Sequence, residues 1–311
     1  MLNKHRFPDF LCIGAQKAGT TWLHNNLQKH PDIGLPTLKE LNYFNGKEKV
    51  FNQTKLKRIL HPHSSRNVKK YLDNWRTYSL KTQVKSQLMR GNLIEVFSYL
   101  DDFYNFSNDK LYSSFLSSMP EKIIGEISPN YSTLSQDSIS HIYSIMPEVK
   151  IIFILRNPMD RSWSHACMDF SRENINLGSS PDKHFIAHFN SEASRTRSDY
   201  LKTLDTWQLY YPKEQIFICF FEELTQNPQG FICRICEFLN LEIDLDYLQQ
   251  ITTKSPKSHA KVYKHNFSQE LKVYLAKLYY PELEQLSSRF GGYATEWLDC
   301  AKRILYSTVT R

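Results

Sequence analysis

The fold is indicated most clearly by the stretch Lys150-Ile-Ile-Phe-Ile-Leu-Arg-Asn-Pro158. Five consecutive apolar residues, Ile151–Leu155, are typical of a strand that is buried on both faces, as in a parallel sheet. Asn157 and Pro158 have the residue types that favour the N-cap and the first position of a helix. The stretch therefore predicts a buried strand over Lys150–Leu155 that leads directly into a helix.

The same succession of a short apolar run and an amphipathic stretch occurs at three other places. The further strands are predicted over Phe10–Gly14, Ile123–Ile127 and Gln215–Phe221, and the helices after them over 20–29, 136–145 and 231–239. A candidate short strand lies at Ile33–Leu35. Strands of continuous apolar residues that alternate with helices indicate a parallel sheet covered on both faces. The predicted fold class is therefore α/β, with a central parallel sheet and helices on both sides.

Two stretches depart from this alternation. Residues 46–120 are rich in Lys, Asn, Ser, Tyr and Phe and show helical patches without a convincing strand. Residues 171–197 are polar and are predicted to form a loop or lid. Neither stretch has the Pro, Gly and Ser content of a flexible linker between domains. The prediction is a single domain over 1–311 with a helical insertion at 46–120.

Composition excludes several classes of protein. Hydrophobic residues make up 41% of the 311 residues and aromatic residues 14%, which suits a large core and argues against a disordered chain. The longest apolar runs are far shorter than the roughly 20 residues of a membrane-spanning helix. Pro8 and Asp9 interrupt the apolar stretch that a signal peptide would need after Lys4-His5-Arg6. We therefore expect a cytoplasmic protein without a membrane span.

Net charge and cysteine content indicate which ligands, macromolecular partners and metal sites to expect. With 39 Lys and Arg against 32 Asp and Glu, the net charge is +7, which suits an acidic ligand. No run of five basic residues occurs, so nucleic acid is not expected as a partner. Cys233 and Cys236 lie within an apolar helical pattern and have no second pair at zinc spacing. We expect these cysteines in the core, and no metal site.

A glycine-rich loop follows the first predicted strand, with the sequence Gly14-Ala-Gln-Lys-Ala-Gly-Thr-Thr-Trp22. Such a loop directs backbone N–H groups and the positive end of a helix dipole toward an anion. The pattern is similar to G-x-x-x-x-G-K-[ST], but Thr20 stands where that motif has lysine, and Lys17 lies inside the loop. The stretch predicts a P-loop-like anion site, with a purely structural turn as the alternative.

A second candidate anion site follows the strand over Lys150–Leu155. Arg156 would leave this strand at the carboxyl end of the sheet, where open α/β sheets bind their ligands. Ser164 lies about two helical turns further on, where its side chain can point back to the same edge. An arginine fork together with a hydroxyl group suits a phosphate. The alternative for Arg156 is a salt bridge at the helix end.

Together the two motifs resemble those of the sulfotransferase superfamily, whose members use 3′-phosphoadenosine-5′-phosphosulfate (PAPS). Gln16–Leu23 looks like the family's 5′-phosphosulfate loop, and Leu155–Ser164 looks like its 3′-phosphate motif. With similar landmarks at 125–131 and 221–224, the resemblance covers roughly residues 8–45 and 120–240. The branch that it resembles most contains heparan-sulfate-type and bacterial carbohydrate or natural-product sulfotransferases.

The resemblance implies roles for the residues of both motifs. Lys17 would contact the phosphosulfate and stabilise charge on the bridging oxygen, while Arg156 and Ser164 would hold the 3′-phosphate. Trp22 matches a tryptophan that stacks on adenine in cytosolic relatives, with a core position as the alternative. The implied donor-binding residues are Gln16, Lys17, Ala18, Gly19, Thr20, Thr21, Trp22, Arg156, Ser164, Lys257 and Ser258.

A sulfuryl acceptor loses a proton as it attacks, so the reaction needs a base within hydrogen-bond reach. Lys39–Phe44 looks like the segment in which the heparan-sulfate branch places a catalytic glutamate. The resemblance therefore implies two catalytic residues, Glu40 as the base and Lys17 at the phosphosulfate. Asn42 stands where relatives often have histidine. The other candidate bases are His24, His165 and Glu126.

The predicted function is metal-independent, in-line transfer of a sulfuryl group from PAPS to a hydroxyl or amine. The acceptor would be a glycan or a small molecule, bound by the aromatic and basic residues of 46–120. A P-loop-type nucleotide kinase, or a nucleotide-binding module without turnover, is the alternative. Neither the acceptor nor the oligomeric state follows from the sequence.

Overall fold

The computed structural model describes residues 6–36, 39–45, 109–117, 119–175, 181–251 and 267–307. The chain divides into two compact units, Met1–Phe7 with Asn42–Ser118 and Pro8–Leu41 with Met119–Arg311. In the first unit, Tyr43 donates a hydrogen bond to Asp109 at 2.7 Å, at the start of helix α5 (Asp109–Ser117). Most of the expected insertion at 46–120 lies outside the described residues, and the single-domain organisation stays a prediction.

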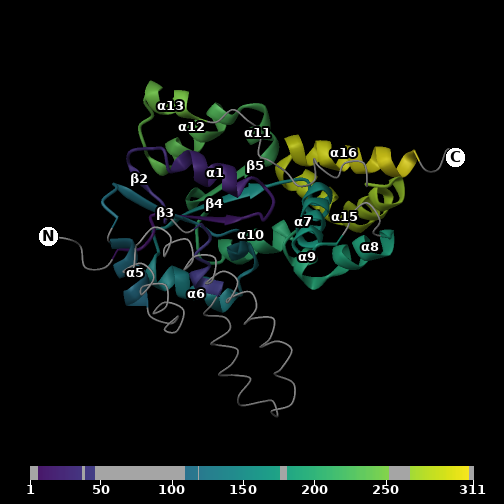
Figure 1. Cartoon of the computed structure of the whole chain (residues 1–311), viewed down its shortest axis with the longest axis horizontal. Helices are drawn as coiled ribbons and strands as arrows, with labels where there is room; N and C mark the ends of the chain where they lie inside the picture. The colour runs from purple at the N-terminus through teal and green to yellow at the C-terminus, as the bar shows by residue number, and fades with distance from the viewer. Residues whose placement is uncertain are drawn as a thin grey trace, which may run out of the picture. The chain divides into compact units, whose positions relative to one another are not determined.

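A five-stranded parallel sheet forms the centre of the second unit (Figure 1). Its order is β2-β3-β1-β4-β5, and the strands are β1 (Phe10–Gly14), β2 (Ile33–Gly34), β3 (Ile123–Ile127), β4 (Lys150–Leu155) and β5 (Ile216–Phe220). In register, Leu11 of β1 lies opposite Glu126 and Ile151 on its two neighbours. The predicted parallel α/β sheet is confirmed.

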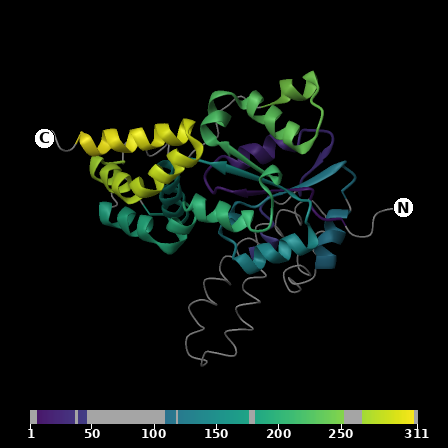
Figure 2. The same ribbon diagram turned by 180° about the vertical axis from the view of Figure 1, so that it is seen from behind.

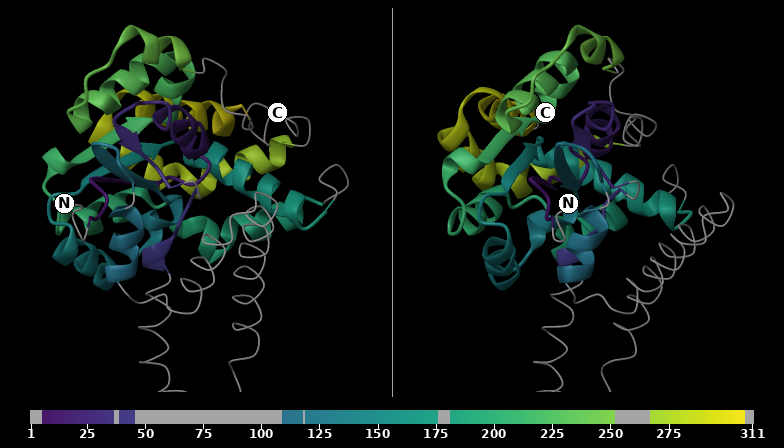
Figure 3. Two further views of the ribbon diagram at one scale, coloured as in Figure 1. Left: turned by 60° about the vertical axis from the view of Figure 1, so that its left-hand side comes forward. Right: turned by 90° about the vertical axis from the view of Figure 1, so that its left-hand side faces the viewer.

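Helices cover both faces of this sheet (Figures 1 and 3). On one face lie α1 (Thr20–Leu27), α11 (Phe221–Gln226), α12 (Pro228–Leu239) and α13 (Leu245–Gln250), and on the other lie α6 (Gln136–Ile145) and α10 (Tyr200–Gln208). Short 3₁₀ turns occupy Pro129–Thr133 and Lys213–Gln215. The central strands β1 and β4 are thereby buried on both sides, as their composition predicts, whereas the edge strand β5 is only partly buried.

The transition from β4 to helix α7 (Pro158–Arg172) forms as the sequence predicts. Every residue of Ile151–Leu155 has no exposed surface. Asn157 caps the helix, because its side-chain oxygen accepts a hydrogen bond from the backbone N–H of Met159 at 3.0 Å. Pro158 takes the first helical position, where a missing N–H costs nothing.

The loop or lid predicted over 171–197 is wrong for most of that stretch. Residues 182–196 form helices α8 (Asp182–Asn190) and α9 (Glu192–Thr196). Phe185 and Phe189 lie one turn apart and are buried, which gives α8 an apolar stripe despite its polar composition. Ser191 caps α9 by accepting a hydrogen bond from the N–H of Ser194 at 3.2 Å.

Two long helices at the C-terminal end, α15 (Gln269–Phe290) and α16 (Gly292–Tyr306), pack side by side (Figure 2). A buried polar network joins α15 to α7. Arg161 has no exposed surface and donates to the hydroxyl of Ser198 at 2.7 Å, while Tyr279 and Ser162 share a hydrogen bond of 2.6 Å. Within the described residues, no helix is long and apolar enough to cross a membrane.

Candidate active site

The glycine-rich loop connects β1 to α1 at the carboxyl end of the sheet. Gly19 adopts a left-handed conformation with φ of 89°. A Cβ atom added there would lie 2.9 Å from Leu224 Cδ1, so both the backbone and the packing against α11 require glycine. Gly19 offers no side-chain cap to α1, so the first N–H groups of this helix keep their capacity to bind an anion.

Arg156 lies directly against this loop. Its Nη1 atom donates a hydrogen bond to the backbone oxygen of Lys17 at 2.6 Å. Its guanidinium group also lies over the ring of Phe221, at 4.5 Å from the ring centre. The structure therefore brings together the two motifs, which are 139 residues apart in the chain.

Two buried donors of the second motif have unused hydrogen-bonding capacity. Arg156 Nε and Ser164 Oγ are both buried and lack a hydrogen-bond partner within the described part of the chain. Only 9% of Arg156 and 1% of Ser164 is exposed. Because buried polar atoms nearly always have a partner, these two donors keep hydrogen-bonding capacity for a ligand.

Lys17 and Arg156 place positive charge at this site, and both side chains are at least partly buried. Burial lowers the pKa of Lys17 to about 8, and the positive charges of Arg156 and Arg172 contribute to the shift. Burial also lowers the pKa of Arg156. Like charges held together in a buried place favour an anionic ligand, because the ligand would relieve their repulsion.

Glu222 is a neighbour that the sequence analysis left without a role. It lies in α11, where its Oε1 atom accepts a hydrogen bond from Trp297 at 2.8 Å. Burial raises the pKa of Glu222 to about 7, against smaller opposing effects that include the charge of Arg156. Near neutral pH, Glu222 therefore cancels only part of the positive charge of Arg156.

The remaining residues implied for donor binding differ in their surroundings. Gln16 Oε1 is buried without a partner among the described residues, and Thr20 is buried at the start of α1, whereas Thr21 is exposed. Trp22 is 6% exposed and makes an edge contact with Phe231 of α12, with ring centres 6.2 Å apart. Ala18 is fully buried within the loop, and Lys257 and Ser258 lie outside the described residues.

Glu40 lies in the segment that follows β2. Its backbone has a φ of 66°, an uncommon conformation for a residue other than glycine. The carboxylate forms an ion pair with Lys39, and 36% of the Glu40 side chain remains exposed. The Glu40 side chain is thus partly exposed, with its carboxylate paired to the neighbouring ammonium group.

The other three candidate bases have partners inside the fold. Glu126 is 1% exposed and accepts hydrogen bonds from Ser128 at 2.6 Å and Tyr131 at 2.5 Å. His24 contacts the backbone oxygen of Pro36 at 3.4 Å, and burial lowers its pKa. The third candidate, His165, is buried and contacts Asp169 of the same helix.

These features define a class of protein: an α/β sheet whose carboxyl edge presents a glycine-rich loop and unused basic and hydroxyl donors to an anion. A model of the sulfotransferase family matches residues 8–245. The chain therefore belongs to the sulfotransferase family.

Two proteins with sequences similar to this chain also have the names of sulfotransferases. The chain is 23% identical over 261 residues to a bifunctional heparan sulfate N-deacetylase/N-sulfotransferase 2 of Bos taurus, a match that spans 79% of this chain and 23% of that protein. It is 24% identical over 147 residues to a heparan sulfate glucosamine 3-O-sulfotransferase 6 of Mus musculus, which spans 45% and 43% of the two chains. The chain thus matches less than half the length of either relative.

A solved structure shares the fold. The crystal structure of a sulfotransferase from Alicyclobacillus acidocaldarius superimposes with a TM-score of 0.60 and 19% sequence identity. The superposition covers 94% of this chain and 99% of that chain. This likeness supports the same fold and is not limited to the two motifs.

Proposed function

We propose that this protein transfers a sulfuryl group from PAPS to a hydroxyl or amine of an acceptor. The observation that carries the proposal is Arg156, which is bound to the glycine-rich loop at Lys17 and whose Nε atom, like Ser164 Oγ of the same motif, is buried and without a partner among the described residues. PAPS carries a 5′-phosphosulfate and a 3′-phosphate. The two motifs would bind these two groups, and family membership supports the same donor.

Each group at the loop has a distinct part in binding the donor. The backbone N–H groups at the start of α1 would hold the 5′-phosphate together with the hydroxyl groups of Thr20 and Thr21. Arg156 and Ser164 would hold the 3′-phosphate through charge-assisted hydrogen bonds. Because Arg156 also holds the backbone oxygen of Lys17, the two phosphate-binding motifs form one connected structure.

Lys17 would stabilise the charge that develops as the bond between sulfur and the bridging oxygen breaks. An ammonium group fixed in a partly buried loop is worth more than one in water, because the local dielectric constant is lower. The bond that forms joins the acceptor oxygen or nitrogen to sulfur, and the leaving group is adenosine 3′,5′-bisphosphate. No step of this displacement requires a metal ion.

Glu40 is the base that we propose for the acceptor proton. The Glu40 side chain is 36% exposed, and its carboxylate would take the proton of a hydroxyl or ammonium group that approaches from solvent. The buried Glu126 is a poorer base for this step, because Ser128 and Tyr131 already donate to its carboxylate. The acceptor itself would be a glycan or a similar polar molecule, as the names of the heparan sulfate relatives suggest, and we place its recognition in residues 46–120.

The experiment combines a transfer assay with a substitution at the base. Wild-type protein is incubated with ³⁵S-labelled PAPS and pools of glycan acceptors, and Glu40→Gln is compared with the exposed control Glu148→Gln. A positioned base contributes about 10²–10⁴-fold, so Glu40→Gln should lower kcat by at least about 100-fold. Binding of adenosine 3′,5′-bisphosphate should stay at the wild-type level, and Glu148→Gln should match wild type in both measurements.

The outcomes separate the alternatives. Labelled product with wild type and none with Glu40→Gln supports both the reaction and the base. Retention of more than about a tenth of the activity, with chemistry rate-limiting, would remove Glu40 from this role. Binding of the bisphosphate without transfer to any acceptor would instead indicate a nucleotide-binding module, and phosphoryl transfer from ATP would indicate a kinase.

A further inference from the structure

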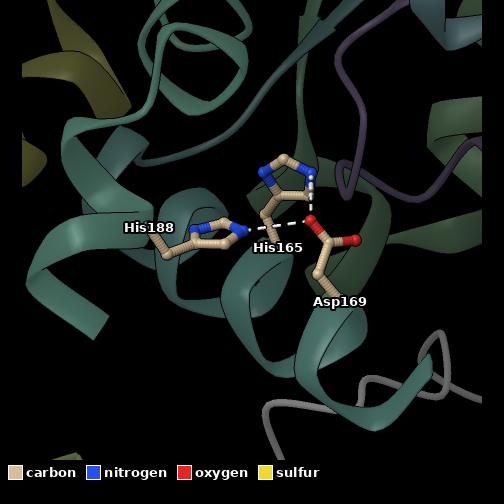
Figure 4. Close-up of side chains that lie close together, drawn as sticks. All are labelled: His165, Asp169 and His188. Carbon is tan, nitrogen blue, oxygen red and sulfur yellow. Dashed lines mark hydrogen bonds and ion pairs between the residues drawn. The ribbon is translucent and has the colours of Figure 1, made fainter. Parts of the chain in front are cut away.

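Three side chains from two helices converge on one another (Figure 4), and the charge of one of them, Asp169, acts on Lys17 of the candidate active site. His165 and Asp169 lie one turn apart on α7, and His188 lies on α8. The Nε2 atom of His165 is 3.2 Å from Asp169 Oδ2, and the Nε2 atom of His188 is 3.0 Å from the same oxygen. Figure 4 shows both contacts ending on one carboxylate oxygen.

The spacing of the three donor atoms is that of ligands around one metal ion. All three atoms lie within 4.8 Å of one another. In the described part of the chain, no other set of three His, Cys, Asp or Glu residues brings its ligand atoms this close together. With metal–ligand bonds of about 2.0–2.1 Å, neighbouring ligands of a tetrahedral zinc ion lie about 3.3 Å apart. The two contacts with Asp169 already have this length.

The helices hold the cluster in place. His165 and His188 have 6% and 12% of their side chains exposed, and their rings meet edge to face at 4.8 Å. Phe170 packs against the ring of His188 at 5.8 Å. An i, i+4 pair on one helix and a third ligand from a packed helix require little rearrangement when an ion enters.

The chemistry of the three ligand atoms favours one kind of metal ion. Two imidazole nitrogens with one carboxylate suit zinc and neighbouring transition metals, whereas Mg²⁺ and Ca²⁺ prefer oxygen ligands. Arg172 approaches the other carboxylate oxygen of Asp169, at 3.9 Å, and leaves Oδ2 to face the two histidines. Three protein ligands leave a fourth tetrahedral position for water.

We propose that His165, Asp169 and His188 form a zinc site that joins α8 to α7. The ion would replace the two N–H···O contacts, and each histidine would carry its remaining proton on Nδ1. Neither Nδ1 atom has a hydrogen-bond partner among the described residues. Since such partners typically raise metal affinity about 10–100-fold, this site should bind zinc less tightly than a fully supported one.

The test uses the full chain after treatment with EDTA and desalting. Calorimetry with zinc chloride should show one ion bound per chain, and thermal unfolding should shift to higher temperature as zinc is added. Asp169→Asn and His188→Asn should each weaken binding at least tenfold. His184→Gln is the matched control, because His184 is exposed on the same helix as His188 and should leave zinc affinity unchanged.

Cobalt provides a second readout that does not depend on the variants. Co²⁺ bound to two nitrogens and a carboxylate gives visible absorption without the charge-transfer band of thiolate ligands. That spectrum supports the proposal even if a variant fails to fold. The proposal is overturned by the absence of stoichiometric zinc binding, by wild-type affinity in both Asp169→Asn and His188→Asn, or by a thiolate band that places the ion on cysteine.

Discussion

Raising the pH should weaken donor binding through one residue, Lys17. Burial and two neighbouring arginines lower its pKa to about 8 in the free protein. A bound phosphosulfate or bisphosphate would place negative charge beside the ammonium group and return the pKa toward its ordinary value of 10.5. At a pH between these two pKa values, Lys17 is mostly neutral in the free protein and protonated in the complex. Lys17 therefore takes up a proton when the ligand binds, and the affinity for the ligand falls as the pH rises.

The size of the effect follows from the two pKa values. For a pKa of about 8 in the free protein, affinity falls by a factor of 1 + 10^(pH − 8), which is about twofold at pH 8 and about tenfold at pH 9. Phosphate groups have a second pKa near 6, so the ligand stays fully ionised above about pH 7.5. Any loss of affinity in this range therefore comes from the protein.

The assay is calorimetric titration with adenosine 3′,5′-bisphosphate from about pH 7.5 to 9.5, in buffers of different ionisation enthalpy. Wild type should take up close to one proton on binding near pH 9. Lys17→Arg keeps its charge over this range and should show a flat profile. Lys277→Gln, which removes an exposed lysine, should behave like wild type. A wild-type affinity that stays constant to pH 9.5, without proton uptake, would refute the assignment of Lys17 to the donor.

Three other predictions concern the same site. Adenosine 3′,5′-bisphosphate should bind about one to two decades more tightly than AMP in calorimetry, because Arg156 and Ser164 would hold the 3′-phosphate; equal affinity would contradict this. Turnover should survive EDTA, because the transfer relies on Lys17 and backbone donors. EDTA would remove the zinc proposed for α7 and α8, but that ion takes no part in the transfer. A strict need for Mg²⁺ would favour the kinase alternative. Exchange of 46–120 for a relative's segment should change acceptor choice while donor affinity stays constant, as transfer and binding assays can determine.

Local signals in the sequence predict the central part of the fold well. The apolar run of β4 and the capping residues Asn157 and Pro158 act over a few neighbouring residues, so their outcome does not depend on distant packing. The glycine at position 19 likewise satisfies a local backbone requirement. The meeting of Arg156 with the backbone of Lys17 could be expected because both follow parallel strands at one sheet edge.

Other features depend on partners that the sequence does not identify. Residues 182–196 have a polar composition, and only their packing reveals that Phe185 and Phe189 form an apolar stripe. Because this segment was predicted as a loop, His188 could not be placed beside Asp169, and the cluster was missed. The spacing of His165 and Asp169 along α7 was the one signal that could have suggested it. That Ser164 lacks a partner is likewise visible only once its surroundings are known.

The buried guanidinium of Arg161 adds to the positive charge that a ligand at Arg156 would meet. Its hydrogen bonds within the described residues go to serine oxygens, and its Nη1 atom has none, while its charge acts on the nearby carboxyl group of Glu282. That charge lowers the pKa of Arg156 further, after burial. A polyanion bound at Arg156 would offset this repulsion, and mass action would then reduce the fraction of unfolded chains. Donor bound at the proposed site would therefore raise the free energy of unfolding, and the protein would unfold at a higher temperature with its donor than without it.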